Sequence, residues 1–455
     1  MTDLNSYVAR EQSRLLGELK DWLRIPSVST LPDHAGDCRQ AADWLARRLK
    51  ALGFTVDTIE TERHPILWAE GPHVPGAPTV LHYGHYDVQP PDPLGEWVTG
   101  PFEPTERNGN LYARGTADDK GQVFCVVAAL EALIKTKGSL PVNMRLLIEG
   151  EEEVGSGSLT KWLTQHPERT RVDAVLVTDV HMVKEGQPSV DAGLRGLCQF
   201  EIEVRTLRAD AHSGLYGGAV PNAIETLWHL LEQIKGPDGR IRIPGVYDKV
   251  AKPTARELKA WKTKVPIKEK DFLKETGARA LTGEKKFMFL ERTWTRPTFE
   301  VHGIVGGFQG AGAKTILPAV ATAKCSMRLV PNMKGKEIAA LVQKYVKKIA
   351  PKFADVKVTI LATGDPVVTP LDSDAFRALD QACKEVFKKE IVPIRSGGSI
   401  PIVPLLMQGK APVLLCGIGL PDDGLHSPNE KIKLSQLWTG IPLFARFFEI
   451  LAEKR

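Results

Sequence analysis

The sequence lacks several features that would place it in other protein classes. Its six cysteines are far apart and form no C-x-x-C pair, so we expect buried thiols rather than disulfides or thiolate metal sites. No apolar run approaches the ~20 residues that span a bilayer. The N-terminus, Met1-Thr2-Asp3-Leu4, has no basic patch followed by an apolar stretch. We therefore expect a cytoplasmic protein that has no secretory signal and no membrane partner.

The chain also lacks a strong excess of charge of either sign. Its formal net charge of +5 is small for 455 residues and gives no support to a nucleic-acid partner. A hydrophobic content of 42% and a charged content of 25% are ordinary for a globular protein. A chain of this length predicts two domains rather than one core.

The order of apolar patterns predicts an α/β domain that is interrupted by an insertion. Compact β-prone runs alternate with helical patterns at both ends of the chain, which favours a mixed, mostly parallel sheet covered by helices on both faces. Near Gly193 the strands begin to alternate apolar and charged residues, which is typical of a sheet with one wet face. We predict a catalytic domain from 1–192 and 369–455 and an inserted α+β domain from 193–368.

A lysine-rich segment, residues 249–292, carries interleaved acidic and aromatic residues. We interpret it as a solvated helical excursion on the inserted domain. Its charges are mixed in sign, which argues against a nucleic-acid surface.

Five short segments carry side chains suited to a pair of metal ions. Each follows an apolar run or lies in a Gly-rich turn, where side chains from distant parts of the chain can converge. Two divalent cations about 3.5–4 Å apart can activate water and polarise a carbonyl. Taken singly, each motif is more often a turn or a helix cap, but their joint occurrence in this order is not expected by chance. The segments are residues 82–87, 115–121, 149–153, 177–179 and 423–427.

The available donors restrict the metals. Imidazole and carboxylate groups without thiolates suit zinc best, with manganese or cobalt as alternatives. One further carboxylate is needed beside the ligands to take a proton from water.

On these residues the sequence resembles the cocatalytic-metal peptidases, a family that includes carnosinase, cytosolic non-specific dipeptidase, aminoacylase, succinyl-diaminopimelate desuccinylase and glutamate carboxypeptidase. The resemblance runs from about Trp22 to the C-terminus and is closest to the dipeptidase branch. Its most specific motifs are Tyr83-Gly84-His85-Tyr86-Asp87-Val88-Gln89-Pro90, Arg114-Gly115-Thr116-Ala117-Asp118-Asp119-Lys120-Gly121 and Asp210-Ala211-His212-Ser213-Gly214.

The resemblance implies a role for each candidate ligand. One metal would be bound by His85, Asp118 and Asp179. The other would be bound by Asp118, Glu153 and His426, so that Asp118 bridges the two, and the peptide bond after Asp118 would be cis.

The resemblance also implies two catalytic helpers beside the metals. Glu152 would be the general base that activates the bridging water, and Asp87 would orient His85. Because Glu151, Glu152 and Glu153 are consecutive, a shift of one position in the match to the family's motif would make Glu151 the base.

The inserted domain of the family is a lid and dimerisation domain. The resemblance implies that His212 acts across a homodimer interface and stabilises the oxyanion of the intermediate. Arg328 would grip the free carboxylate of the substrate, with help from Thr315, Gly398 and Ser399.

The predicted function is metal-dependent hydrolysis of dipeptides or short peptides with a free C-terminal carboxylate. Two alternatives remain at this point. The same site could serve an N-acyl amino acid amidohydrolase or a carboxypeptidase, because the sequence does not show the shape of the pocket. The chain could also be a peptide-binding protein without catalysis.

Overall fold

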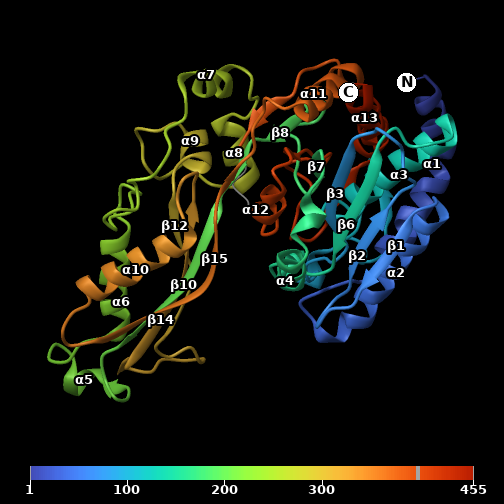
Figure 1. Cartoon of the computed structure of the whole chain (residues 1–455). Coiled ribbons are helices and arrows are strands. Elements are labelled where there is room, and N and C mark those ends of the chain that lie inside the picture. Colours follow the sequence, from blue (N-terminus) through green and yellow to red (C-terminus); the bar gives the residue numbers. More distant parts are fainter. Residues whose placement is uncertain (1, 396–399, 454–455) are drawn as a thin grey trace.

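The structure is a computed structural model, and it describes residues 2–395 and 400–453. Two lobes stand side by side, and each is built around its own sheet (Figure 1). The larger lobe takes its strands from both ends of the chain, and the elongated second lobe takes its strands from the middle.

A six-stranded sheet forms the centre of the larger lobe, with the strand order β1-β2-β6-β3-β7-β18. Strands β6, β3, β7 and β18 run parallel to one another, whereas β2 is antiparallel to both β1 and β6. The predicted mixed, mostly parallel sheet is thereby confirmed. The strand bounds are β1 Thr55–Ile59, β2 Ile66–Glu70, β3 Thr79–His85, β6 Asn143–Glu149, β7 Ala174–Val177 and β18 Val413–Leu415.

Helices cover both faces of this sheet because successive strand residues point to opposite sides. Leu146 and Leu176 pack into a core with the helices of one face, whereas Leu147 and Val177 pack with those of the other. The first face carries α1 Thr2–Leu23, α2 Ala35–Ala51, α3 Lys120–Lys137, α11 Asp374–Phe387 and α13 Leu434–Glu453; the second carries α4 Gly157–Gln165 and α12 Val403–Leu406.

The second lobe contains an antiparallel sheet in the order β12-β14-β10-β15. Helices α6 and α10 pack their apolar stripes on the face formed by Phe200, Ile202 and Val204. The residues that alternate with these, such as Glu203, stay in contact with solvent, as the sequence predicted. The bounds are β10 Gly196–Arg205, β12 Thr298–Gly306, β14 Val320–Leu329, β15 Asp355–Gly364, α6 Ala223–Ile234 and α10 Gly335–Ile349.

Several short pairs complete the chain. In one of them β17 pairs in parallel with β8, and neither strand joins the six-stranded sheet. The remaining bounds are β4 Thr105–Arg107, β5 Asn110–Tyr112, β8 Ser189–Asp191, β9 Gly193–Leu194, β11 Ala211–His212, β13 Ile316–Leu317, β16 Val367–Val368, β17 Val392–Ile394, β19 Lys431–Lys433 and α5 Ser213–Tyr216.

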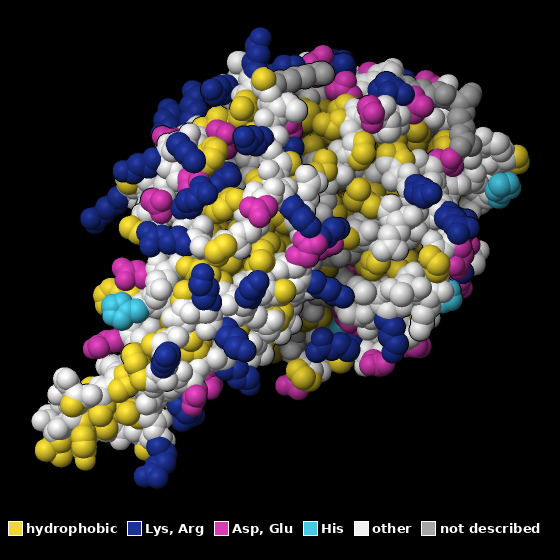
Figure 2. Space-filling model, turned by 60° about the vertical axis from the view of Figure 1, so that its left-hand side comes forward, with side chains coloured by type: hydrophobic (Ala, Val, Ile, Leu, Met, Phe, Trp, Pro, Cys, Tyr) yellow, Lys and Arg dark blue, Asp and Glu magenta, His cyan; other side chains and the backbone are white. Residues whose placement is uncertain are grey.

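The lysine-rich segment contains three helices, α7 Ala255–Thr263, α8 Glu269–Thr276 and α9 Phe289–Trp294. Its interpretation as a solvated excursion was wrong for its apolar residues. Trp261 and Trp294 are buried, meet edge to face and pack against Val392 and Ile394 of β17. Its lysines lie on the surface among acidic side chains (Figure 2).

Candidate metal centre

The carboxyl ends of the central strands position most of the site. Strand β3 ends at His85, β6 ends at Glu149 and β7 ends at Val177, two residues before Asp179. Because neighbouring parallel strands end at the same edge of a sheet, the segments that follow them meet there. The loop before α3 adds Asp118, and the loop between β18 and β19 adds His426.

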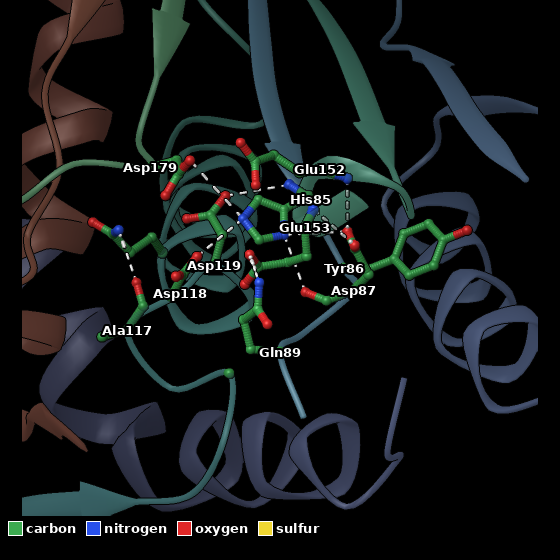
Figure 3. A network of polar contacts seen from close by, with 12 residues as sticks. His85, Tyr86, Asp87, Gln89, Ala117, Asp118, Asp119, Glu152, Glu153 and Asp179 are labelled. Carbon is green, nitrogen blue, oxygen red and sulfur yellow. Dashed lines mark hydrogen bonds and ion pairs between the residues drawn. The ribbon is translucent and has the colours of Figure 1, made fainter. Parts of the chain in front are cut away.

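The donor atoms gather in two sets within this edge. One set contains His85, Glu152 and Asp179, and the other contains Asp118, Glu153 and His426; within each set the donors lie within 4.8 Å of one another. Figure 3 shows the side chains of five of these residues pointing toward one common centre: His85, Asp118, Glu152, Glu153 and Asp179.

Asp118 lies between the two sets. Its Oδ1 is 3.0 Å from Nε2 of His85, and its Oδ2 is 3.0 Å from Nε2 of His426. The second set has the three residues that the resemblance implied for one metal. The first set differs from its predicted counterpart, since Glu152 stands with His85 and Asp179 where Asp118 was expected.

Asp87 is completely buried behind the cluster. Nδ1 of His85 lies 3.0 Å from the backbone carbonyl oxygen of Asp87 and 3.3 Å from Oδ1 of Asp87. The Asp87 carboxylate also accepts hydrogen bonds from the backbone N–H groups of Glu152 and Glu153 and from the Ser29 hydroxyl. One carboxylate therefore ties the orientation of His85 to the position of the acidic turn.

Glu430 shapes the loop that carries Asp118. Its buried carboxylate accepts hydrogen bonds from the backbone N–H groups of Gly115, Ala117 and Asp118 and from the Arg114 guanidinium. The Asp118–Asp119 peptide bond is cis, as the resemblance implied.

The three acids in a row have different surroundings. The Glu151 carboxylate accepts hydrogen bonds from the backbone N–H groups of His64 and Ser158. These bonds hold it against the surrounding loops. Glu152 belongs to the first donor set and Glu153 to the second. Glu152 and Glu153 therefore face the donor cluster, whereas Glu151 faces the surrounding loops.

Burial and mutual repulsion dominate the electrostatics of the site. Burial raises the pKa of Glu152 and of Asp179 well above their ordinary values, and nearby carboxylates raise both further. Burial also opposes ionisation of Asp118, but hydrogen bonds from His426 and His85 outweigh it and lower its pKa. Hydrogen bonds to Asp118 and Glu153 raise the pKa of His426 to about 10.

The donors fit two divalent cations. Four carboxylates and two imidazoles converge, so in the metal-free chain their repulsion is relieved by protons on the histidines and by the raised pKa of Glu152 and Asp179. Oxygen and imidazole donors suit zinc, manganese or cobalt. Bound cations would also remove the carboxylate repulsion.

His212 lies far from this centre along its own chain. It ends β11 at the narrow end of the second lobe, beside α5 (Figure 1), and its side chain is exposed. Thr315 is its neighbour, since the carbonyl oxygen of Thr315 accepts a hydrogen bond from the Ser213 N–H at 3.1 Å. Any site that uses His212 from this surface can therefore use Thr315 as well.

The remaining substrate-binding predictions fall in two places. Arg328 lies on β14, is partly buried and is paired in register with Thr298 and Leu197. Gly398 and Ser399 lie outside the described residues.

Sequence reasoning missed three residues that hold the site together. Gln89 donates a hydrogen bond to Oε2 of Glu153 at 2.8 Å, Ser29 binds Asp87, and Glu430 fixes the Asp118 loop. Gln89 stands within a quoted motif, which was a usable signal. The sequence around Ser29 and Glu430 gave none.

Comparison with known proteins places the chain in a family. Residues 81–450 match the sequence profile of Peptidase family M20/M25/M40. The chain belongs to this peptidase family. The family confirms the resemblance drawn from the motifs, including the dipeptidase branch, and it makes the chain a metallopeptidase.

Members of the family resemble the chain over almost its whole length. Beta-Ala-His dipeptidase of Homo sapiens is 30% identical over 98% of this chain and 92% of that protein. Cys-Gly metallodipeptidase dug1 of Schizosaccharomyces pombe is 31% identical over 99% and 98%.

Solved structures of similar proteins share the fold of this chain. Human carnosine dipeptidase 1 has a TM-score of 0.86 at 30% identity and covers 99% of this chain and 98% of its own. The M20 family metallo-carboxypeptidase Sso-CP2 of Sulfolobus solfataricus has a TM-score of 0.87 at 30% identity, covering 96% and 99%. None of the helices in the described part of the chain is long and apolar enough to cross a membrane.

Proposed function

We propose that the chain hydrolyses the peptide bond of dipeptides or short peptides that carry a free C-terminal carboxylate. The observation that carries this proposal is the convergence of six imidazole and carboxylate side chains in two adjoining donor sets. Support comes from two relatives that are 30% and 31% identical to this chain and are named Beta-Ala-His dipeptidase and Cys-Gly metallodipeptidase.

In this proposal His85, Asp118 and Asp179 hold one divalent cation, and Asp118, Glu153 and His426 hold the other. Zinc is the best candidate for both. Bound cations would polarise the scissile carbonyl and make water a nucleophile at neutral pH.

The remaining residues move the proton and hold the site in shape. Glu152 takes the proton from the attacking water and delivers it to the leaving amine. Asp87 keeps the imidazole of His85 aligned, through the contacts described above.

We further propose that residues 193–368 form a lid and dimerisation domain between catalytic parts 1–192 and 369–455. The exposed His212 and Thr315 would then enter the site of a partner subunit. There His212 would donate a hydrogen bond to the oxyanion, and Thr315 would help Arg328 to hold the substrate carboxylate.

An apolar surface on the second lobe supports the dimer. Trp228 of α6 is 64% exposed, and Val305 of the edge strand β12 is 60% exposed. Leu215 and Tyr216 are also exposed at the narrow end of the lobe, where apolar side chains gather (Figure 2). Contiguous exposed apolar residues mark protein–protein contacts in soluble proteins.

A single substitution tests the proposed base. Glu152→Gln keeps an oxygen donor and the shape of the side chain but cannot accept the proton. We expect kcat for dipeptides to fall by about 10²–10⁴-fold with the metal content retained. Glu151→Gln serves as the matched neighbour and should lose far less. Near-normal turnover by Glu152→Gln, together with an inactive Glu151→Gln, would show that Glu151 rather than Glu152 is the general base.

The similarity to Sso-CP2 favours one second candidate, a carboxypeptidase that removes the last residue of longer peptides. The same metal centre would serve it. Comparison of kcat/KM for dipeptides, tripeptides and N-acyl amino acids, with chelated and metal-restored protein, separates these substrate classes.

A further inference from the structure

A cavity of about 490 Å³ lies between the lysine-rich segment and the larger lobe. Residues of α8 and α9 line one side of it, and residues of β8 and β17 line the other. Its volume is in the range of pockets that bind small molecules. Much of its lining is apolar, including Val183, Ile267, Phe272, Leu290, Trp294 and Ile394. The charged lining residues are Lys184, Asp191, Arg195, Asp271 and Arg395, of which Arg395 is paired with Glu257.

The cavity adjoins the metal centre. His181 lines it two residues after Asp179, and the backbone of His181 forms an isolated bridge with Gly419, on the loop that continues to His426. None of the residues assigned to the metals lines the cavity, so it is a neighbouring space rather than the metal centre itself.

The cavity also borders the proposed carboxylate grip. Arg195 lines it, and burial together with the positive charge of nearby Arg328 lowers the pKa of Arg195 to about 10. A dipeptide with its scissile carbonyl at the metal donors and its carboxylate at Arg328 has its C-terminal residue between these points. The side chain of that residue would therefore face the space bordered by His181 and Arg195.

The wall of the cavity contains a buried carboxyl oxygen that has no hydrogen-bond donor among the described residues. Asp191 ends β8 and is only 3% exposed, and its backbone is held in register with Ile394 of β17. Its Oδ1 forms no hydrogen bond with any residue that the structure describes. Burial raises the pKa of Asp191 to about 8, and no neighbouring cation is among the causes of this shift. A buried carboxyl oxygen without a donor costs folding free energy, which a ligand with a donor group can recover.

We propose that Asp191 is a specificity residue that accepts a hydrogen bond from the positively charged end of a long substrate side chain seated in this cavity. The apolar walls would contact the methylene stem of a lysine or arginine side chain at the C-terminal position of the dipeptide. Asp191 would contact the ammonium or guanidinium group at its end. This inference rests on the proposed dipeptidase function and names a preferred substrate class for it.

The decisive comparison uses Ala-Lys and Ala-norleucine, which have stems of the same length and differ by the terminal amine. For the wild-type chain we expect kcat/KM to favour Ala-Lys by about ten- to a hundredfold, as a charge-assisted hydrogen bond allows. In Asp191→Asn this ratio should fall to within about twofold of one, with most of the change in KM. Ala-Gln, a neutral donor, should lie between the two substrates. Glu185→Gln removes an exposed carboxylate outside the cavity and should keep the wild-type ratio.

Binding of the free amino acids tests the inference without turnover. Calorimetry on the wild-type chain should show tighter binding of L-lysine than of L-norleucine, and Asp191→Asn should abolish this difference. Equal binding of the two amino acids, or a ratio unchanged in Asp191→Asn, overturns the role of Asp191 and leaves the dipeptidase proposal standing. Failure of the wild-type chain to cleave either dipeptide would instead overturn the dipeptidase proposal, and calorimetry would still decide the role of Asp191.

Discussion

The two lobes place their polar functional residues in opposite surroundings. In the larger lobe His85 and Asp118 are buried at the end of a sheet and are held by hydrogen bonds from several elements. At the narrow end of the second lobe His212 is exposed, and its ring accepts a hydrogen bond only from the nearby Gly214 N–H among the described residues. A buried cluster is organised within its own chain, whereas an exposed side chain such as His212 can meet a partner surface, as we propose.

The strongest test of this contrast is His212→Ala. If the side chain completes a site in a partner subunit, its loss should lower kcat by about 10²–10³-fold, which is typical of a lost oxyanion donor. The free energy of unfolding should hardly change, because the side chain is exposed.

Mixing two inactive variants shows which subunit supplies the histidine. Subunits of His212→Ala and Glu152→Gln, exchanged at equal amounts, would form mixed dimers with one intact site each. About a quarter of the wild-type activity should return, since half of the dimers are mixed and each has one working site of two. No recovery after proven subunit exchange would show that His212 acts within its own chain, or not at all.

The buried lobe makes a different prediction. Asp87→Ala removes the carboxylate that orients His85 and accepts the Glu152 and Glu153 N–H groups. We expect the affinity for the metals to fall by about 10–100-fold, measured by competition with a chromogenic chelator. Ser29→Ala, which removes one donor to the same carboxylate, is the milder control. Unchanged affinity in Asp87→Ala would show that the backbone alone positions His85.

The smallest effect is a dependence on pH. A metal ligand must be neutral imidazole, but the pKa of His426 in the metal-free chain is raised to about 10, so a proton competes with the metal below that pH. The affinity should therefore rise by about tenfold per pH unit for each proton displaced, and it should weaken as the pH falls. In His426→Asn the slope of the logarithm of metal affinity against pH should decrease by about one, because one proton fewer is displaced. The same slope in that variant would show that His426 is not a ligand.

The metal centre was the part of the molecule that sequence could predict best. His85 ends β3 and Asp179 closely follows β7, and parallel strands bring their ends together whatever the rest of the chain does. The amphipathic strand around Phe200 and the helical stripes of the second lobe could also be predicted, because hydrophobic periodicity is a local signal.

The contacts between lobes could not be predicted in this way. Trp261 packs with Val392, which lies more than a hundred residues later, and no local pattern records such a contact. Ser29 acts through one long-range hydrogen bond and Glu430 through several, and neither residue belongs to a periodic pattern. The unpaired oxygen of Asp191 is likewise a property of its surroundings in space.

The most direct test of the account is crystallography of the metal-loaded chain with anomalous scattering recorded at the absorption edge of zinc. We predict two peaks, one among His85, Asp118 and Asp179 and one among Asp118, Glu153 and His426, about 3.5–4 Å apart with Asp118 bound to both. A single peak, or peaks that do not involve Asp118, would contradict it.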